Sequence, residues 1–86
     1  MTDDELFDEV GAALQIRGGW HYEPATTPGA QPSWCLDPGG AVAVAVNVVK
    51  GSVVAYLPAQ DREVVLSGVD GLVGWLDLRE GRGRSD

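Results

Sequence analysis

His21 and Cys35 are the residues of this chain whose types could carry out nucleophilic chemistry. Each is the single residue of its kind among the 86, and Glu23 follows two positions after the histidine. A thiol beside an imidazole can form a thiolate–imidazolium pair, and a neighbouring carboxylate can orient the ring. No sequence motif for an oxyanion hole, and none for a third residue that would orient the base, accompanies them. We therefore interpret Cys35 as a small buried thiol and His21 as a loop histidine, and a small Cys/His enzyme stays only as a third hypothesis.

Acidic residues crowd the start of the chain, where they could attract a hard cation. A structural zinc site needs more Cys and His ligands than this chain has, and the acidic residues lack the spaced loop of a calcium site. No glycine-containing segment has the spacing of a phosphate-binding loop. We expect no metal ion, no cofactor and no catalytic residue. These carboxylates are candidates for the electrostatic steering of a partner, and the alternative is a solvated helix start that matches the helix dipole. They are Asp3, Asp4, Glu5, Asp8 and Glu9.

The charge balance narrows the class of partner. Thirteen acidic residues against six basic ones give a net charge of −7, which repels nucleic acid and anionic membranes at long range. We therefore expect a protein partner of basic character, no direct nucleic-acid binding and no membrane binding.

No apolar run approaches the length of a membrane span, the first residues do not resemble a signal peptide, and one cysteine cannot form an internal disulfide. These features predict a cytoplasmic protein, and the abundance of Ala, Gly and Val suggests a bacterial or phage genome rich in GC.

Two helices are predicted at the ends of the chain. Residues 2–17 form the first, because Thr2 and Glu5 have the spacing of a capping box and apolar residues recur at helical intervals. Gly11 weakens this helix by about 1 kcal/mol relative to alanine. Residues 68–79 form the second, in which apolar residues again follow the helical period and Leu78 widens the stripe. We expect one domain over 1–79 and a disordered tail over 80–86.

Four strands are predicted between the helices: 33–36, about 41–49, 52–57 and about 62–66. The last three are rich in valine, which favours a pleated surface, and turn residues separate them. A two-residue turn at Lys50-Gly51 places Val48 opposite Val53. The segments therefore predict an antiparallel meander of four strands.

Side-chain alternation gives this sheet two unlike faces. One face is strongly apolar and is predicted to be the core. Its members are Val42, Val44, Val46, Val48, Val53, Ala55, Leu57, Val64 and Leu66. The other face is small and partly apolar. Its members are Ala43, Ala45, Asn47, Val54, Tyr56, Glu63 and Val65. We expect Val54, Tyr56 and Val65 to make it a binding patch or a homodimer interface. Whether Trp34 or Cys35 faces the core stays open, because the turn before the second strand decides it.

Residues 20–32 are the least regular stretch, since three prolines oppose both helix and central strand. Trp20, Tyr22 and Trp34 are large amphipathic side chains of the type enriched in binding hot spots. The same rings could instead close one end of the core. Both interpretations remain open from the sequence.

The predicted fold is α+β: a helix, a four-stranded antiparallel meander and a second helix, with both helices on one face. The alternative places one helix on each face. The leading functional hypothesis is a non-enzymatic protein-binding module, of the adaptor, escort, immunity or inhibitor type. It would bind through the apolar sheet face or the aromatic loop. The alternative is a DNA-mimic inhibitor of a nucleic-acid-binding protein, which would require carboxylates spaced like phosphates.

Overall fold

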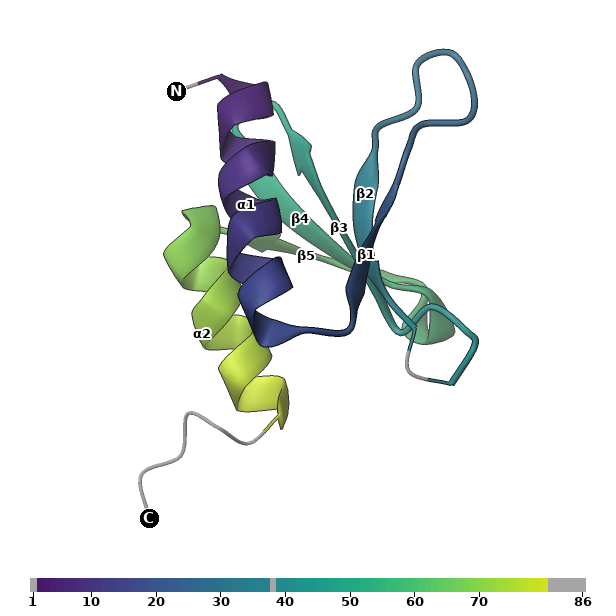
Figure 1. Cartoon of the computed structure of the whole chain (residues 1–86), viewed down its shortest axis with the longest axis vertical. Helices are drawn as coiled ribbons and strands as arrows, with labels where there is room; N and C mark the ends of the chain where they lie inside the picture. Colours follow the sequence, from purple (N-terminus) through teal and green to yellow (C-terminus); the bar gives the residue numbers. More distant parts are fainter. Residues whose placement is uncertain (1, 38, 81–86) are drawn as a thin grey trace.

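The computed structural model describes residues 2–37 and 39–80, the latter range ending at the last residue of the second helix. Two helices enclose five strands and one short 3-10 helix along the chain (Figure 1). The elements are α1 (Asp3–Arg17), β1 (Trp20–Glu23), β2 (Ser33–Leu36), β3 (Val44–Val49), β4 (Ser52–Leu57), η1 (Pro58–Gln60), β5 (Arg62–Leu66) and α2 (Gly68–Glu80). The α+β class and the order helix, sheet, helix are confirmed.

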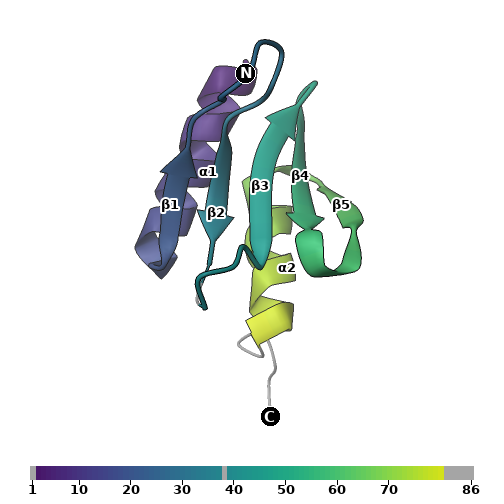
Figure 2. The same cartoon turned by 90° about the vertical axis from the view of Figure 1, so that its right-hand side faces the viewer.

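The strands form one sheet in the order β1-β2-β3-β4-β5, and every neighbouring pair is antiparallel (Figure 2). Each strand therefore pairs with the one that precedes it in the chain. This is the meander that the sequence predicts, but it has five strands rather than four. The extra strand is β1.

The prediction that residues 20–32 lack regular structure is wrong for their first part. Trp20–Glu23 pairs along its whole length with β2, and His21 lies opposite Cys35. A four-residue segment becomes a strand here because its backbone groups find partners on β2, and an aromatic–polar alternation suits a sheet with two unlike faces. The prolines fall after the strand, in the connection to β2.

The predicted registers between the valine-rich strands are confirmed. Val48 lies opposite Val53, and Val46 lies opposite Ala55, which in turn lies opposite Val64. The hairpin turn is the predicted two-residue one, in which Lys50 and Gly51 both have positive φ, at 50° and 79°. That pair of conformations matches the right-handed twist of the flanking strands.

The second predicted strand starts later than expected. Strand β3 begins at Val44 rather than at residue 41, and Val42 is exposed instead of buried in the core. Ala43 donates its backbone N–H to the carbonyl oxygen of Leu36 at 2.8 Å, which closes the connection from β2. Residues 39–42 therefore belong to the connection between β2 and β3, and the alternation of buried and exposed side chains begins only after them.

Both helices lie on the same face of the sheet, as Figures 1 and 2 show from two directions. Helix α1 covers β1 and β3, and α2 covers β4 and β5. An arrangement with one helix on each face is excluded. The hydrophobic core fills the space between the sheet and the helices. It consists of Leu6, Val10, Leu14, Trp20, Val44, Val46, Val48, Val53, Ala55, Leu57, Leu72 and Leu76.

Helix α1 begins as the sequence predicts. The Thr2 hydroxyl oxygen accepts from the backbone N–H of Glu5 at 3.2 Å, and the Glu5 carboxylate accepts from the backbone N–H of Thr2 at 3.4 Å. This capping box satisfies two donors that a helix start would otherwise leave unpaired. The helix ends at Arg17, whose guanidinium is 2.8 Å from Asp77 of α2. This ion pair joins the two helices.

Gly11 has a role that helix propensity does not reveal. It is buried, and a Cβ at this position would lie 2.6 Å from Cε2 of Trp34 and still closer to Cζ2. The indole of β2 therefore packs directly on the backbone of α1. Gly11 does not merely weaken the helix, because it allows the helix to approach the sheet at this point.

Helix α2 differs from expectation at its end. Leu72 and Leu76 are buried as predicted, but the side chain of Leu78 is 68 % exposed and does not extend the buried stripe. The helix includes Glu80, which the sequence assigned to the tail. The predicted disordered tail otherwise lies outside the described residues. No helix in the described part of the chain is long and apolar enough to cross a membrane.

Candidate functional site: the open face of the sheet

The face of the sheet opposite the helices is uncovered by any described element, and we call it the open face (Figure 2). Alternation along each strand and the printed registers define its side chains. They are His21, Glu23, Ser33, Cys35, Ala45, Asn47, Val49, Ser52, Val54, Tyr56, Glu63 and Val65. This face contains one of the two predicted sets of partner-binding residues.

Apolar side chains occupy the middle of the open face and its β5 side. Val54 and Tyr56 lie on β4, with Ala45 opposite Tyr56 on β3 and Val65 opposite Val54 on β5. The Val65 side chain is 69 % exposed, although β-branched apolar residues usually avoid water. The structure thus brings the predicted Val54, Tyr56 and Val65 together as one patch.

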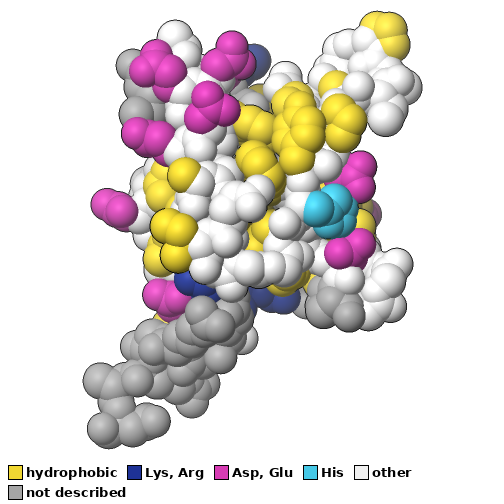
Figure 3. Space-filling model, viewed as in Figure 1, with side chains coloured by type: hydrophobic (Ala, Val, Ile, Leu, Met, Phe, Trp, Pro, Cys, Tyr) yellow, Lys and Arg dark blue, Asp and Glu magenta, His cyan; other side chains and the backbone are white. Residues whose placement is uncertain are grey.

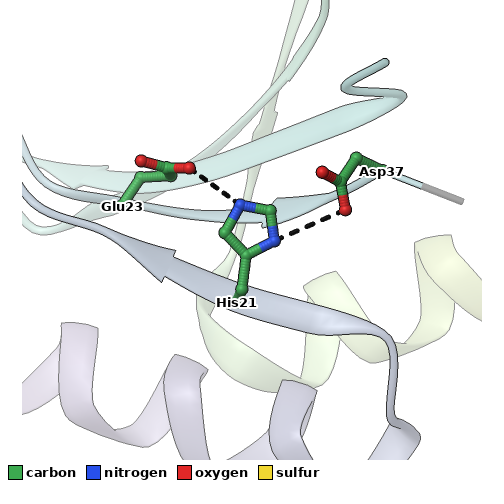
Figure 4. A network of polar contacts seen from close by, with 3 residues as sticks. All are labelled: His21, Glu23 and Asp37. Atoms are coloured by element: carbon green, nitrogen blue, oxygen red, sulfur yellow. Dashed lines mark hydrogen bonds and ion pairs between the residues drawn. The ribbon is translucent and has the colours of Figure 1, made fainter. Parts of the chain in front are cut away.

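A polar cluster centred on His21 occupies the β1 side of the open face (Figure 4). Its Nε2 is 2.8 Å from a carboxylate oxygen of Glu23, on the same strand. Its Nδ1 is 3.4 Å from a carboxylate oxygen of Asp37, which directly follows β2. Both ring nitrogens therefore face carboxylates, and the imidazole bridges β1 to the end of β2.

Cys35 lies directly opposite His21 in the β1–β2 pairing, and its side chain is buried. Burial raises the pKa of the thiol above its usual value, and the charges of Glu23 and Asp37 raise it further. A raised pKa keeps the thiol protonated at neutral pH, and the thiolate is the nucleophilic form. The ring nitrogens of His21 are directed to carboxylates, so the geometry does not favour a thiolate–imidazolium pair.

Tyr56 connects the middle of the open face to the start of β5. Its hydroxyl donates to the Asp61 carboxylate at 3.0 Å, and Glu63 lies opposite it on β5. The hydrogen bond to Asp61 raises the pKa of the phenol, and the charges of Asp61 and Glu63 raise it further. Asp61 holds a left-handed backbone conformation, at φ 47° and ψ 50°, that ends η1 and directs the chain into β5. Aspartate adopts this conformation more readily than most residues.

The predicted aromatic residues do not form a surface loop. Trp20 is in the core and Trp34 packs against it, because both point to the helix side of the sheet. Trp34 stacks on Phe7 of α1 at 5.6 Å between ring centroids, and Tyr22 meets Trp34 edge-on at 5.4 Å. Only Tyr22 remains half exposed. The rings thus close one end of the core, which was the second interpretation that the sequence allowed.

Carboxylates gather at the start of α1, as Figure 3 shows. Asp3 accepts the backbone N–H of Gly51 at 2.8 Å and so fastens the helix to the β3–β4 turn, while Glu5 completes the capping box. Asp4, Asp8 and Glu9 are exposed. Two of the five predicted steering residues therefore have structural partners, and three extend into solvent.

The sequence analysis missed His21, Glu23 and Asp37 as members of one face. The signal was the alternation of aromatic and polar residues over 20–23, which has the period of a half-buried strand.

Within the described ranges there is no pocket, and no group of three His, Cys, Asp or Glu side chains is arranged to hold a metal ion. Comparison of the chain with protein-family models, with curated proteins and with solved structures gives no match.

Proposed function

We propose that this protein is a non-enzymatic binding module that recognises a protein partner through the open face. The observation that carries the proposal is an apolar patch made by the exposed Val65 and the partly buried Val54 and Tyr56, on a sheet whose other face already holds the core. An antiparallel sheet needs only one covered face to be stable. Apolar side chains on the second face are therefore available for an interface.

The acidic start of α1 supports the proposal in a second way. Asp4, Asp8 and Glu9 extend into solvent on one part of the surface. Clustered charge of one sign accelerates association with an oppositely charged partner, and this acceleration falls as salt screens the charges. We infer that these residues increase the association rate of a basic partner, while the open face provides the contact.

The test is a pull-down from the source organism with the full chain as bait, at low and high salt. Val65→Asp places a charge in the patch, and Ile16→Asp is the matched control because Ile16 is an exposed apolar residue on α1. Circular dichroism of each variant verifies that the fold is intact. We expect one dominant partner that is captured by the wild type and by Ile16→Asp, and lost with Val65→Asp.

Two outcomes would change the proposal. Equal capture by wild type and Val65→Asp, or no specific partner at either salt, would refute binding through the open face. Capture of a DNA-binding protein that added DNA displaces would favour the DNA-mimic hypothesis over a general binding module.

A further inference from the structure

Four carboxylates stand on or beside the open face, in two groups. Glu23 and Asp37 flank the histidine on the β1 side, as Figure 4 shows, and in Figure 3 acidic side chains adjoin the histidine. Asp61 and Glu63 lie next to Tyr56 on the β5 side. The apolar patch lies on β4 and β5, directly beside the β5 group and two strands away from β2, which Asp37 follows.

No lysine or arginine among the described residues occupies an open-face position. Arg62 lies opposite Leu57, which belongs to the core side, and Lys50 is in the hairpin turn. Arg17 pairs with Asp77 between the helices, and Arg79 lies over the Trp75 ring of α2 at 5.1 Å. The carboxylates of the open face therefore have no Lys or Arg side chain of the described sheet beside them.

Two ionisable groups at different places on this face respond to the same sign of charge. Burial raises the pKa of Cys35, and the charges of Glu23 and Asp37 raise it further, while the hydrogen bond to Asp61 and the charges of Asp61 and Glu63 raise the pKa of Tyr56. Carboxylates are thus concentrated in two places, around His21 and beside Tyr56. Neighbouring strands are ~4.8 Å apart, so β1 and β5 are separated by roughly 19 Å across four strand spacings.

Building on the proposed function, we propose that the open face binds a protein surface that presents apolar residues to β4 and β5 and Lys or Arg residues at two places roughly 19 Å apart, one for each carboxylate group. Charge complementarity selects this occupant. A second copy of the chain would bring carboxylates against carboxylates, and each copy carries a net charge of −7. The partner is therefore a different, cationic protein.

The test uses two synthetic helical peptides and the isotope-labelled full chain, observed by NMR. At 1.5 Å per residue, ends about 13 residues apart span the same distance. The first peptide has an apolar stripe in its middle and Lys-Arg pairs at both ends. The second has the same stripe with Glu pairs. We expect the Lys-Arg peptide to shift the amide signals of β3, β4 and β5 and to bind at least about tenfold more tightly than the Glu peptide.

Single-charge variants test whether both groups take part. Glu23→Gln and Glu63→Gln each remove one charge from opposite sides of the open face, and Asp70→Asn removes one from an exposed position on α2. All three change the net charge by the same amount. We expect each Gln variant to weaken binding of the Lys-Arg peptide about threefold, and Asp70→Asn to leave it within measurement error.

Several results would overturn the inference. In the peptide experiment these are equal affinity for the two peptides, no binding of either peptide, or amide shifts confined to α1. In the variant experiment it is an equal loss of affinity in all three variants. Dimerisation of the chain through the open face at high concentration would also overturn it. The proposed function and the cationic flanks are refuted by different results. A natural partner whose capture depends on Val65 but not on Glu23 or Glu63 refutes only the cationic flanks, whereas a partner indifferent to Val65 refutes the use of the face.

Discussion

The two faces of the sheet are made from alternate residues of the same strands, yet they differ in almost every physical respect. On β4, Val53 is fully buried under the helices, whereas its neighbour Val54 lies on the open face and keeps contact with solvent. The covered face is aliphatic and aromatic, and among the described residues it contains no buried charged side chain. The open face combines apolar residues with a histidine, a thiol and carboxylates. Most of the buried apolar side chains therefore lie on the covered face, and the open face is the one that the proposed function uses.

The covered face is itself divided. Under α1 it is aromatic, where Phe7, Tyr22 and Trp34 meet. Under α2 it is mainly aliphatic, where Leu72 and Leu76 are buried and Trp75 packs beside them against the core. Aromatic rings are large and rigid, so α1 can fit against them only where its own surface is small. Gly11 provides that small surface.

The largest expected effect compares adjacent valines. Val53→Ala removes two buried methyl groups and leaves a cavity, so we expect it to lower the free energy of unfolding by about 2–3 kcal/mol. Val54→Ala makes the same chemical change on the open face, and we expect a loss below about 1 kcal/mol. Urea denaturation of both variants and of the wild type measures the difference. Equal losses would show that the open face is as packed as the covered one.

The second prediction compares two helical glycines. Gly11→Ala forces a methyl group into the Trp34 ring, which costs about 1–3 kcal/mol and exceeds the gain of about 1 kcal/mol in helix propensity. We expect a net destabilisation of up to about 2 kcal/mol. Gly74 has open space around its Cβ position, so Gly74→Ala should stabilise the protein by about 0.5–1 kcal/mol. Thermal and urea unfolding measure both changes.

Trp34→Phe provides the control for the glycine comparison. The smaller ring removes the atoms that the new methyl group would meet, and it also removes an indole N–H that donates no hydrogen bond within the described structure. In a double-mutant cycle, Gly11→Ala should therefore be less harmful in the Trp34→Phe background. Strict additivity would contradict the close packing of this pair.

The smallest expected effect is a pH dependence that arises from the open face. The pKa values of Cys35 and Tyr56 are raised in the folded protein, so the unfolded chain loses these protons first as the pH rises. Folded-state stability should therefore fall above the usual thiol pKa of about 8.5, and fall further near the usual phenol pKa of about 10. The slope of unfolding free energy against pH measures this. Cys35→Ala should reduce the fall in stability near the usual thiol pKa, and Tyr56→Phe should reduce it near the usual phenol pKa. Unchanged slopes would contradict the raised pKa values of these two residues.

Much of the fold could be predicted from the sequence because its contacts are local. The capping box of Thr2 and Glu5 involves residues three apart, and the Lys50-Gly51 turn sets the β3–β4 register within a few positions. The patch of Val54, Tyr56 and Val65 followed from the same alternation. Strand β1 escaped prediction because four residues between glycines and a proline give a weak signal that becomes a strand only when β2 lies beside it.

The sequence by itself determined the two helices, the meander and the apolar alternation of its central strands, because capping, turn chemistry and periodicity act between near neighbours. Only the tertiary structure decided that Trp34 points to the helices and Cys35 to the open face, since a connection of irregular shape sets that orientation. The tertiary structure also brought His21, Glu23 and Asp37 together and placed the Trp34 ring against Gly11. These features depend on which surfaces meet after the chain has folded, and no local pattern encodes such a meeting.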